Sequence, residues 1–548
     1  MTTFKHFKPM HSLRELGDFF YRDAEPVAVK APQWIAFNHA LADELGIADE
    51  FRDNEQGLAI WAGNAVPDWA QPAALAYAGH QFANLVPQLG DGRAMLLAEL
   101  QDSHGKLWDV QLKGAGRTPF SRGGDGRSAI GPVLREYLLS ESMHALGVPT
   151  TRALAAVASG EPVFRDDAVP GAVFTRVASS HLRIGSFQFA SLHGGPKKVQ
   201  QLADYAIARH FPELNSPEPD TNSPEPDTNS PEPDTNNPEL DTNSPELEAN
   251  PYLALLHAAA KRQAELVNHW QRIGFIHGVM NTDNCSISGE TIDYGPAAFL
   301  DTYIPDKKFS AIDKRGRYAF SNQPGIARWN LARLAETLLP LFIATNSHAT
   351  NSHTTENDEA IAMATRVLSE YNEYFQELYL ATMGKKLGIA NAEPADHTLI
   401  EDFLTLLQAQ EVDYTQAFWQ LANELDEHDD TPAASTGPQA PASALFRDTA
   451  AFAKWRQRWL TRVLANQNEH AQPQIQALMR AVNPALIPRN HRIAEAIQAV
   501  EQRGDLQRFH ELLQAWQHPY KMPTTALEIE LYQAPKEDEQ VQRTFCGT

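Results

Sequence analysis

The spacing of hydrophobic and polar residues changes near residue 250. Between residues 75 and 190, short apolar or alternating runs such as RAMLLAEL, WDVQLKG and GAVFTRV are typical of β-strands. After about residue 250 the pattern is mostly helical, over YLALLHAAAKRQAELVNHW, ARWNLARLAETLLPLFI, AIAMATRVLSEYNEYFQELYLATM and PALIPRNHRIAEAIQAVEQ. A β-rich region followed by a helix-rich region predicts an α+β protein with a cleft between two lobes.

Two segments of the β-rich region have well-defined patterns. WDVQLKG alternates with a period of two, so Lys113 is expected to project from a strand on the side opposite Val110 and Leu112. GPVLREYLLSESMHALGVP predicts a helix, because Pro132 suits its first position and Gly147 suits its C-cap. Pro149, two residues after Gly147, prevents the helix from continuing. Glu136 is expected in the first turn of this helix.

Three low-complexity segments interrupt these patterns. The first repeats a unit of seven residues, NSPEPDT, and predicts a disordered acidic insert over about 213–250. It is not a coiled-coil heptad, because its a and d positions are polar and Pro recurs in every unit. An acidic docking segment is the alternative. A second insert is expected over about 344–358, and a flexible linker over about 426–444.

Composition excludes several classes of protein. The chain has 548 residues, 43% of them hydrophobic, which allows one large domain or two to three smaller ones. Its net charge is −23, or −13 without the ten acidic residues of 215–248, and this argues against a nucleic-acid partner. With no apolar run of about 18 residues and no apolar signal core in MTTFKHFKPMHSL, we expect a soluble, cytoplasmic protein without membrane contact.

Glycines and charged residues in the β-rich region indicate a phosphate site. A Gly-Asp-Gly-Arg turn, Gly90 to Arg93, precedes a strand and would let backbone N–H groups approach a phosphate. About 20 residues later comes Lys113, and Glu136 follows on the next helix. A strand Lys paired with a helix Glu holds nucleotide phosphates in kinase-like sites. When each feature is taken alone, the alternatives are a simple turn at Gly90–Arg93 and a solvent-exposed side chain at Lys113.

The segment GAGRTPFSRGGDGRSAIG adds an anion-binding composition. It has six glycines and three arginines in 18 residues and directly precedes the N-terminus of the predicted helix. A mobile loop is the alternative. Farther on, FTRVASSHLRIGSFQF contributes Arg176 and Arg183. Several cations near one site suggest a triphosphate, although a single Arg is more often a surface residue.

The segment HGVMNTDN, residues 277–284, is similar to a catalytic loop in which one residue has changed. In kinases the two residues that open this loop, His-Arg or His-Gly, are followed by an Asp that acts as the base. An Asn five residues after this Asp binds a metal ion. Here Asn284 is kept, Val279 replaces the base, and Asp283 has appeared beside the Asn. A hairpin from Asn284 to the Asp293-Tyr294-Gly295 segment would bring Asn284 and Asp293 to one Mg²⁺. A tight turn is the alternative for the last tripeptide.

These motifs resemble the SelO (YdiU) family, bacterial relatives of selenoprotein O. The resemblance is carried by YAGHQFANLVPQLGDGRAMLLAEL, WDVQLKGAGRTPFSRGGDGRSAIGPVLREYLLSE, GAVFTRVASSHLRIGSFQF, HGVMNTDN, IDYGPAAFLD and the tail RTFCGT. It extends from about residue 30 to the C-terminus and implies a bilobal, protein-kinase-like fold. The β-rich N-lobe, with an N-terminal extension, is expected over 1–190. The helical C-lobe, with the catalytic segment 277–295, is expected over 191–548.

The resemblance implies a nucleotidyltransferase rather than a kinase. Members transfer AMP from ATP to Ser, Thr or Tyr hydroxyls of other proteins and release pyrophosphate, and some also use UTP. The nucleotide is reversed, so that its α-phosphate faces the acceptor and a base near Val279 is no longer needed. By motif, the resemblance assigns Gly90, Gly92, Arg93, Lys113, Asp125, Gly126, Arg176, Arg183 and Asp293 to the nucleotide, Asn284 and Asp293 to Mg²⁺ or Mn²⁺, and Asp283 to the general base.

Three alternatives stay open from the sequence. An ordinary kinase would transfer the γ-phosphate, and a pseudokinase would bind ATP without catalysis. The third concerns the two cysteines, Cys285 and Cys546, which exclude a disulfide scaffold and fit a reducing compartment. Cys546 stands where eukaryotic relatives carry selenocysteine, and its only possible partner is Cys285, beside a metal ligand. Two unpaired thiols are the simpler expectation.

Overall fold

The computed structural model describes residues 7–165, 167–215, 247, 249–343, 353–425, 437–465 and 471–544. Most of the predicted acidic insert, the first residues of the second insert and of the linker, and Cys546 lie outside these described residues. Within the described ranges, no helix is both long enough and apolar enough to cross a lipid bilayer.

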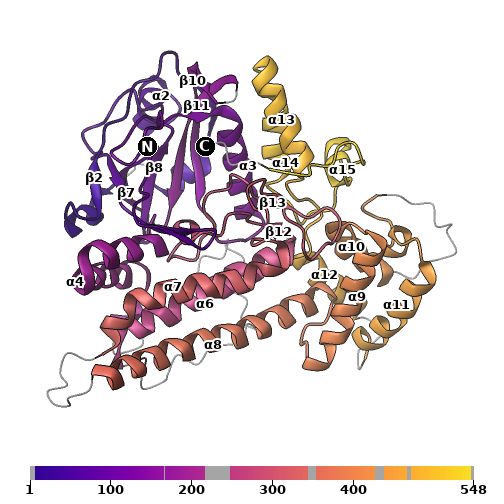
Figure 1. Ribbon diagram of the computed structural model, residues 1–548. Coiled ribbons are helices and arrows are strands. Elements are labelled where there is room, and N and C mark those ends of the chain that lie inside the picture. The colour runs from indigo at the N-terminus through magenta and orange to yellow at the C-terminus, as the bar shows by residue number, and fades with distance from the viewer. Residues whose placement is uncertain are drawn as a thin grey trace.

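A large antiparallel sheet forms the N-terminal region of the molecule (Figure 1). The three predicted strands are its central members, β7 (Ala94–Gln101), β8 (Leu107–Lys113) and β11 (Ala168–Ala178). The order along the sheet is β2-β4-β7-β8-β11-β10-β3. The other members are β2 (Tyr21–Asp23), β3 (Gln33–Phe37), β4 (Ala73–Leu75) and β10 (Arg152–Phe164), with β1 (Pro9–Met10) beside β7 and β9 (Ser128–Ala129) beside β11.

Both faces of this sheet are buried. Val110 and Leu112 point from β8 into a core that also contains residues of α1 (His39–Glu44) and α2 (Glu55–Trp61), as the alternating pattern predicted. The opposite face is covered as well, since Gln111 has no exposed surface. Lys113 therefore projects into a protein-lined space and not into bulk solvent.

Helix α3 (Ile130–Ala145) covers the face of the sheet that carries Lys113. The helix predicted from sequence is confirmed, but it begins at Ile130 and not at Pro132, because the preceding residues Ser128 and Ala129 already pair with β11 as β9. Glu136 therefore lies in the second turn and not in the first. The helix ends as expected, with Gly147 at a φ of 70° directly after the C-cap residue.

Helices dominate the chain after residue 184, in agreement with the predicted mixture of sheet and helix. Figure 1 shows α6, α7 and α8 running side by side beneath the sheet, and α13 and α14 next to α3. The longer helices in the described residues are α4 (Ile184–His210), α6 (Pro251–Ile273), α7 (Gln323–Phe342), α8 (His353–Lys386), α9 (His397–Gln410), α10 (Tyr414–Leu421), α11 (Thr449–Val463), α12 (Gln472–Val482), α13 (Asn490–Arg503), α14 (Gln507–Ala515) and α15 (Ala526–Tyr532).

Two boundaries differ from those expected. The fourth predicted helix begins at Asn490, because residues 484–489 are not helical and the N–H groups of Ala485 and Leu486 bond to Pro519 O. The division expected at residue 190 lies inside α4, where the backbone leaves the helical conformation only at Gly195.

A portion of each expected flexible connection is ordered. Helix α8 already includes residues 353–358, which we assigned to the second insert. Residues 437–444 of the expected linker pack against α10, with Ala442 fully buried in a 3₁₀ turn (Ala442–Leu445). Trp419 Nε1 donates a hydrogen bond of 3.0 Å to Pro438 O. Residues 437–444 are mostly small and pack closely, so the prediction that this portion of the linker is flexible was wrong.

The hairpin expected between Asn284 and Asp293 does not form. Ser286 makes its bridge with Arg183, and Thr291 makes its bridge with Thr150, so the two arms pair with other segments and not with each other. The His277 ring closes the segment instead, with Nε2 2.8 Å from Ile292 O. Strand β12 (Phe275–Ile276) pairs with β13 (Ala298–Phe299), and this pair keeps the two ends of the segment 277–295 together.

Candidate active site

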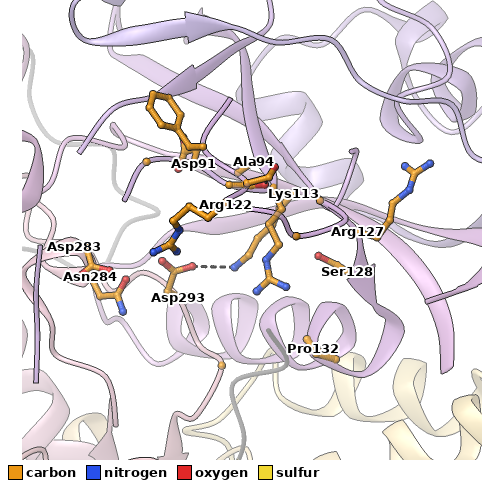
Figure 2. Close-up of a pocket in the computed structure, with 18 of the residues that line it drawn as sticks. Asp91, Ala94, Lys113, Arg122, Arg127, Ser128, Pro132, Asp283, Asn284 and Asp293 are labelled. Atoms are coloured by element: carbon orange, nitrogen blue, oxygen red, sulfur yellow. Dashed lines mark hydrogen bonds and ion pairs between the residues drawn. The ribbon is translucent and has the colours of Figure 1, made fainter. Parts of the chain in front are cut away.

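All of the residues that the sequence pointed to line one cavity of about 720 Å³. The cavity lies between the sheet, helix α3 and the segment 277–295. Figure 2 shows Asp283 and Asn284 at one end, Lys113 and Asp293 in the middle and Arg127 toward the other side. The predicted residues in its wall are Gly90, Gly92, Arg93, Lys113, Asp125, Gly126, Glu136, Arg176, Arg183, Asp283, Asn284 and Asp293.

Lys113 forms the predicted ion pair with Glu136. Lys113 Nζ lies 2.6 Å from Glu136 Oε2 and 2.9 Å from Asp293 Oδ1, so one ammonium joins the sheet, helix α3 and the segment 277–295. Arg176, from β11, makes a parallel set of contacts, 3.2 Å to Glu136 Oε1 and 2.8 Å to Asp293 Oδ1. Two carboxylates and two cations thus form a closed network at the centre of the cavity.

Asp293 is held as a carboxylate by the cations around it. Burial would raise its pKa, but Lys113, Arg176 and Arg183 outweigh burial and hold the pKa well below its usual range. Its backbone has a φ of 65°, which a residue other than Gly rarely adopts. The strained backbone turns this side chain toward Lys113, as the dashed line in Figure 2 marks.

Arg183 connects the cavity to the segment 277–295. Its Nη1 donates 2.8 Å to Asp283 O and lies 3.5 Å from Asp293 Oδ2, and the guanidinium lies over the Tyr77 ring at 4.5 Å. The side chain is buried, so its charge interacts strongly with the carboxylates of Asp293, Asp91 and Asp283 and is little screened by water. A phosphate in the cavity would meet a cation that is already fixed in place.

The Gly90–Arg93 turn is pinned by the glycine- and arginine-rich segment. Thr118 Oγ1 donates 2.6 Å to Asp91 O, and Ser121 Oγ donates 2.5 Å to Gly92 O. Gly90 has a φ of 76°, and a Cβ at this position would overlap the Phe120 ring. The turn is therefore a built portion of the cavity wall.

Asp125 lies at the rim of the cavity and is partly exposed. Its carboxylate pairs with Arg165 at 2.8 Å and accepts a hydrogen bond of 2.9 Å from Arg127 N. These contacts order the loop around Gly126. Among the residues predicted to bind the nucleotide, Asp125 therefore uses its side chain to stabilise the loop.

Asp283 is buried at the end of the cavity. Oδ1 accepts no hydrogen bond from the described residues, and Oδ2 is 3.4 Å from Gln81 Nε2. Burial outweighs the attraction of Arg183 and raises the pKa of this carboxyl to about 6. A carboxylate with a raised pKa is a better proton acceptor than an ordinary Asp.

Asn284 and Asp293 could each give one oxygen to a divalent cation. Asn284 Nδ2 donates 3.1 Å to Val279 O, which leaves its carboxamide oxygen for a ligand. The described residues hold no group of three or more His, Cys, Asp or Glu that could bind a metal by themselves. The donor set fits Mg²⁺, which takes one or two protein oxygens and completes its shell with phosphate and water.

Several residues of the site were missed. Asp91 accepts 3.0 Å from Gln111 Nε2 and lies 3.9 Å from Arg183, and Gln111 Oε1 accepts 2.7 Å from Arg176. Both had a signal in the sequence, because Asp91 lies inside the glycine turn and Gln111 shares the face of Lys113. Arg122 also lines the cavity, in the arginine-rich segment but at a position that composition could not single out.

Of the two cysteines, the structure describes Cys285. Cys285 is a buried free thiol, and burial raises its pKa to about 12. Such a thiol is inert at neutral pH. Cys546 lies outside the described residues, so their pairing stays a sequence hypothesis.

A buried network of charges in a cavity between sheet and helices is typical of the active site of an enzyme. Residues 4–517 match the family described as "Protein adenylyltransferase SelO", and the chain belongs to this family. It is 47% identical to "Protein nucleotidyltransferase YdiU" of Rhizobium johnstonii, over 97% of this chain and 96% of that protein. The proteins of the same name from Rhizobium meliloti and Rhodopseudomonas palustris are each 46% identical over 99% of both chains. The predicted family and the predicted nucleotidyltransferase class are confirmed.

Proposed function

We propose that this enzyme transfers AMP from ATP to Ser, Thr or Tyr hydroxyls of target proteins and releases pyrophosphate. UTP is a second possible donor, which would give UMP transfer. The observation that carries the proposal is the position of Asp283, a buried carboxylate at the end of the cavity, where Val279 has replaced the base of a kinase.

The cations of the cavity support a triphosphate as ligand. ATP carries about four negative charges, and transfer of its phosphate groups requires positioning and charge neutralisation. Lys113, Arg93, Arg176 and Arg183 all line the cavity. With one divalent cation these four side chains carry six positive charges, and Glu136 and Asp293 offset two of them, which leaves about four to balance the charge of the nucleotide.

Asn284 and Asp293 would hold the metal ion, Mg²⁺ or Mn²⁺. When bound, a divalent cation neutralises phosphate charge and withdraws electrons from phosphorus. The chain's own residues prepare this site: Lys113 and Arg176 keep Asp293 ionised, and the bond from Asn284 to Val279 O fixes the carboxamide.

In the proposed reaction, the acceptor hydroxyl oxygen attacks the α-phosphorus of ATP. A new bond forms between this oxygen and the α-phosphorus, and the bond between the α-phosphorus and the bridging oxygen of pyrophosphate breaks. The hydroxyl proton passes to Asp283. Arg176 and Arg183, on the buried side of the cavity, would hold the leaving pyrophosphate, so the nucleotide lies with its terminal phosphates inward.

We also propose a bilobal, kinase-like arrangement. A sheet Lys, a helix Glu and an Asp from the segment after the catalytic loop meet as they do in a kinase site. In this arrangement residues 1–190 would form the sheet-rich lobe and residues 191–548 the helical lobe, with α4 continuing from one into the other. Fold analogy alone would favour a kinase, whereas the replacement of the base by Val279, the position of Asp283 and the buried Arg176 and Arg183 support the reversed nucleotide.

Labelled ATP tests the proposal directly. Incubation of the enzyme with protein acceptors and Mg²⁺ or Mn²⁺ should transfer the label of α-labelled ATP and not that of γ-labelled ATP. Transfer of the γ-label would show a kinase. ATP binding without transfer of either label under both metals would show a pseudokinase.

A further inference from the structure

A hairpin that the sequence did not single out reaches the catalytic end of the cavity. Strands β5 (Gly79–Gln81) and β6 (Asn84–Val86) pair antiparallel and are joined by Phe82 and Ala83. The hairpin comes from the N-terminal region of the chain, yet it contacts the loop about residue 282 and lies against α4. Gln81 and Phe82 line the cavity together with Asp283.

Backbone groups of the hairpin fix the loop that carries Asp283. His80 N donates 2.6 Å to Thr282 Oγ1, and Phe82 N donates 3.0 Å to Asn281 Oδ1. Thr282 Oγ1 in turn donates 2.7 Å to Gln188 Oε1 on α4. The hairpin and α4 together hold the two residues that precede Asp283.

The Asp283 side chain lies between Gly79 and Gln81. Its Oδ1 is buried, and a Cβ on Gly79 would lie only 2.5 Å from this oxygen and 2.9 Å from Asp283 Cβ. Only a residue without a side chain fits here. Because Oδ1 is enclosed, Oδ2 is the oxygen that remains for an acceptor hydroxyl, and Gln81 Nε2 lies 3.4 Å from it.

The tip of the hairpin has a strained backbone. Phe82 and Ala83 have φ values of 50° and 69°, which two-residue turns usually assign to Asn and Gly. Residues other than Gly are strained in this region of φ and often occur there at functional sites. The strain places the Phe82 ring 5.1 Å from the Tyr318 ring, at the cavity wall, and leaves Leu85 exposed outside.

We propose that the Gly79–Val86 hairpin is the acceptor side of the active site. Gln81 is a positioning residue that directs Asp283 Oδ2 toward the hydroxyl, and Phe82 is the apolar wall against which the acceptor residue of the protein substrate lies. This inference rests on the role proposed above for Asp283. The nucleotide side, formed by Lys113, Arg176 and the glycine turn, is separate from it.

Gln81 variants test the positioning role. Gln81→Glu keeps the shape but removes the amide donor, and Gln81→Leu removes all polarity. With α-labelled ATP and synthetic peptides that each contain one Ser, Thr or Tyr, both should lower kcat by about tenfold to a hundredfold. The KM for ATP should stay within about twofold, because no phosphate contact is changed. Gln88→Ala, an exposed residue outside the cavity wall, is the matched control.

Gly79→Ala tests the same position without changing any polar group. The added methyl must displace the Asp283 side chain, so kcat should fall as in the Gln81 variants while ATP binding, measured by calorimetry, is kept. Gly325→Ala is the control, because a Cβ there meets no atom within 4 Å. Unchanged kcat in Gly79→Ala and in both Gln81 variants would overturn the proposal.

Phe82 variants test the acceptor wall. Phe82→Ala should raise the KM for the peptides several-fold, and Phe82→Leu, which restores an apolar side chain, should recover most of the loss. If Phe82→Ala and the Gln81 variants weaken ATP binding as strongly as they affect the peptides, the hairpin belongs to the nucleotide side and the inference is wrong. Transfer of γ-label by the wild type would instead contradict the proposed function, whichever side the hairpin serves.

Discussion

Asp283 and Asp293 lie in the same cavity, yet their surroundings push their pKa values in opposite directions. Burial dominates at Asp283 and raises its pKa to about 6, whereas the cations around Asp293 overcome burial and lower its pKa. When the pKa values of two carboxylates differ in this way, one can serve as a proton acceptor and the other as a permanent anion. Both residues are aspartates in one short segment, so the difference between their pKa values comes from the groups that surround each side chain.

This difference predicts two distinct losses. Asp293→Ala should abolish AMP transfer, because it removes a metal ligand and leaves Lys113 and Arg176 with Glu136 as the one partner they share in the network. Asp283→Ala should lower the rate by about 10²–10⁴-fold while ATP binding stays measurable. Radiolabel transfer and calorimetry of ATP binding check both. Equal loss of ATP binding in the two variants would remove the separate role of Asp283.

Lys113 gives a second prediction among single residues. Lys113→Met should raise the Kd for ATP about tenfold or more, because a charge-assisted contact to phosphate is worth roughly 1.5–3 kcal/mol. Equilibrium binding with a fluorescent ATP analogue measures this. Lys8→Met, which replaces an exposed lysine outside the cavity wall, should leave the Kd unchanged.

Among the helices and strands, α3 carries the most constraints. It supplies Glu136 to the cavity, and one turn later Glu141 joins it to β10 and to the segment before α1. Glu141 accepts 2.9 Å and 3.0 Å from Arg152, 2.8 Å from Ala153 N and 2.8 Å from Asn38 Nδ2. The helix therefore cannot shift along the sheet without breaking this set.

Removal of Glu141 should destabilise this contact. Glu141→Ala leaves Arg152 buried without its main partner, which costs about 3–5 kcal/mol for a buried pair. We expect a lower thermal midpoint and a reduced rate of transfer at elevated temperature. Glu359→Ala, at an exposed position of α8, should change neither, and an unchanged midpoint in Glu141→Ala would contradict the argument.

In the molecule as a whole, buried histidines link the sheet to the helices. His210, at the end of α4, has Nε2 2.7 Å from Ser180 Oγ, and Arg262 of α6 donates to its carbonyl. Burial lowers its pKa well below 6.5, helped by Arg209, Arg262 and Lys106, while Asp109 acts in the opposite sense. His210 is therefore neutral in the folded protein.

This neutrality predicts a dependence of stability on pH. The unfolded chain binds a proton at His210 below a pH of about 6.5, and the folded chain does not, so this contribution is present above that pH and is lost as the pH falls. His210→Gln should reduce the loss of thermal midpoint between pH 7 and pH 5. His510→Gln, on the exposed face of α14, should leave the dependence as it is. An unchanged pH dependence in His210→Gln would contradict this.

Local patterns were enough for the central strands, helix α3 and the order of the charged residues. Alternation placed Lys113 and Gln111 on one face of β8, and Gly147 marked the end of α3, because these features depend on neighbours in the chain. The start of α3 was predicted two residues too late, because the pairing of β9 with β11 decides it. The motif resemblance then selected the residues of the cavity. Apart from the Lys113–Glu136 ion pair, it did not assign side-chain contacts.

Other features depended on the three-dimensional packing. The arms of segment 277–295 found partners at Arg183 and Thr150, more than 100 residues away, so a hairpin within the segment was the wrong expectation. The contact of Gln81 with Asp283 spans about 200 residues, and the packing of residues 437–444 depends on α10. Spacing in the sequence carries no information on such contacts. They are decided by burial and by hydrogen bonds that form only when the sheet and the helices come together.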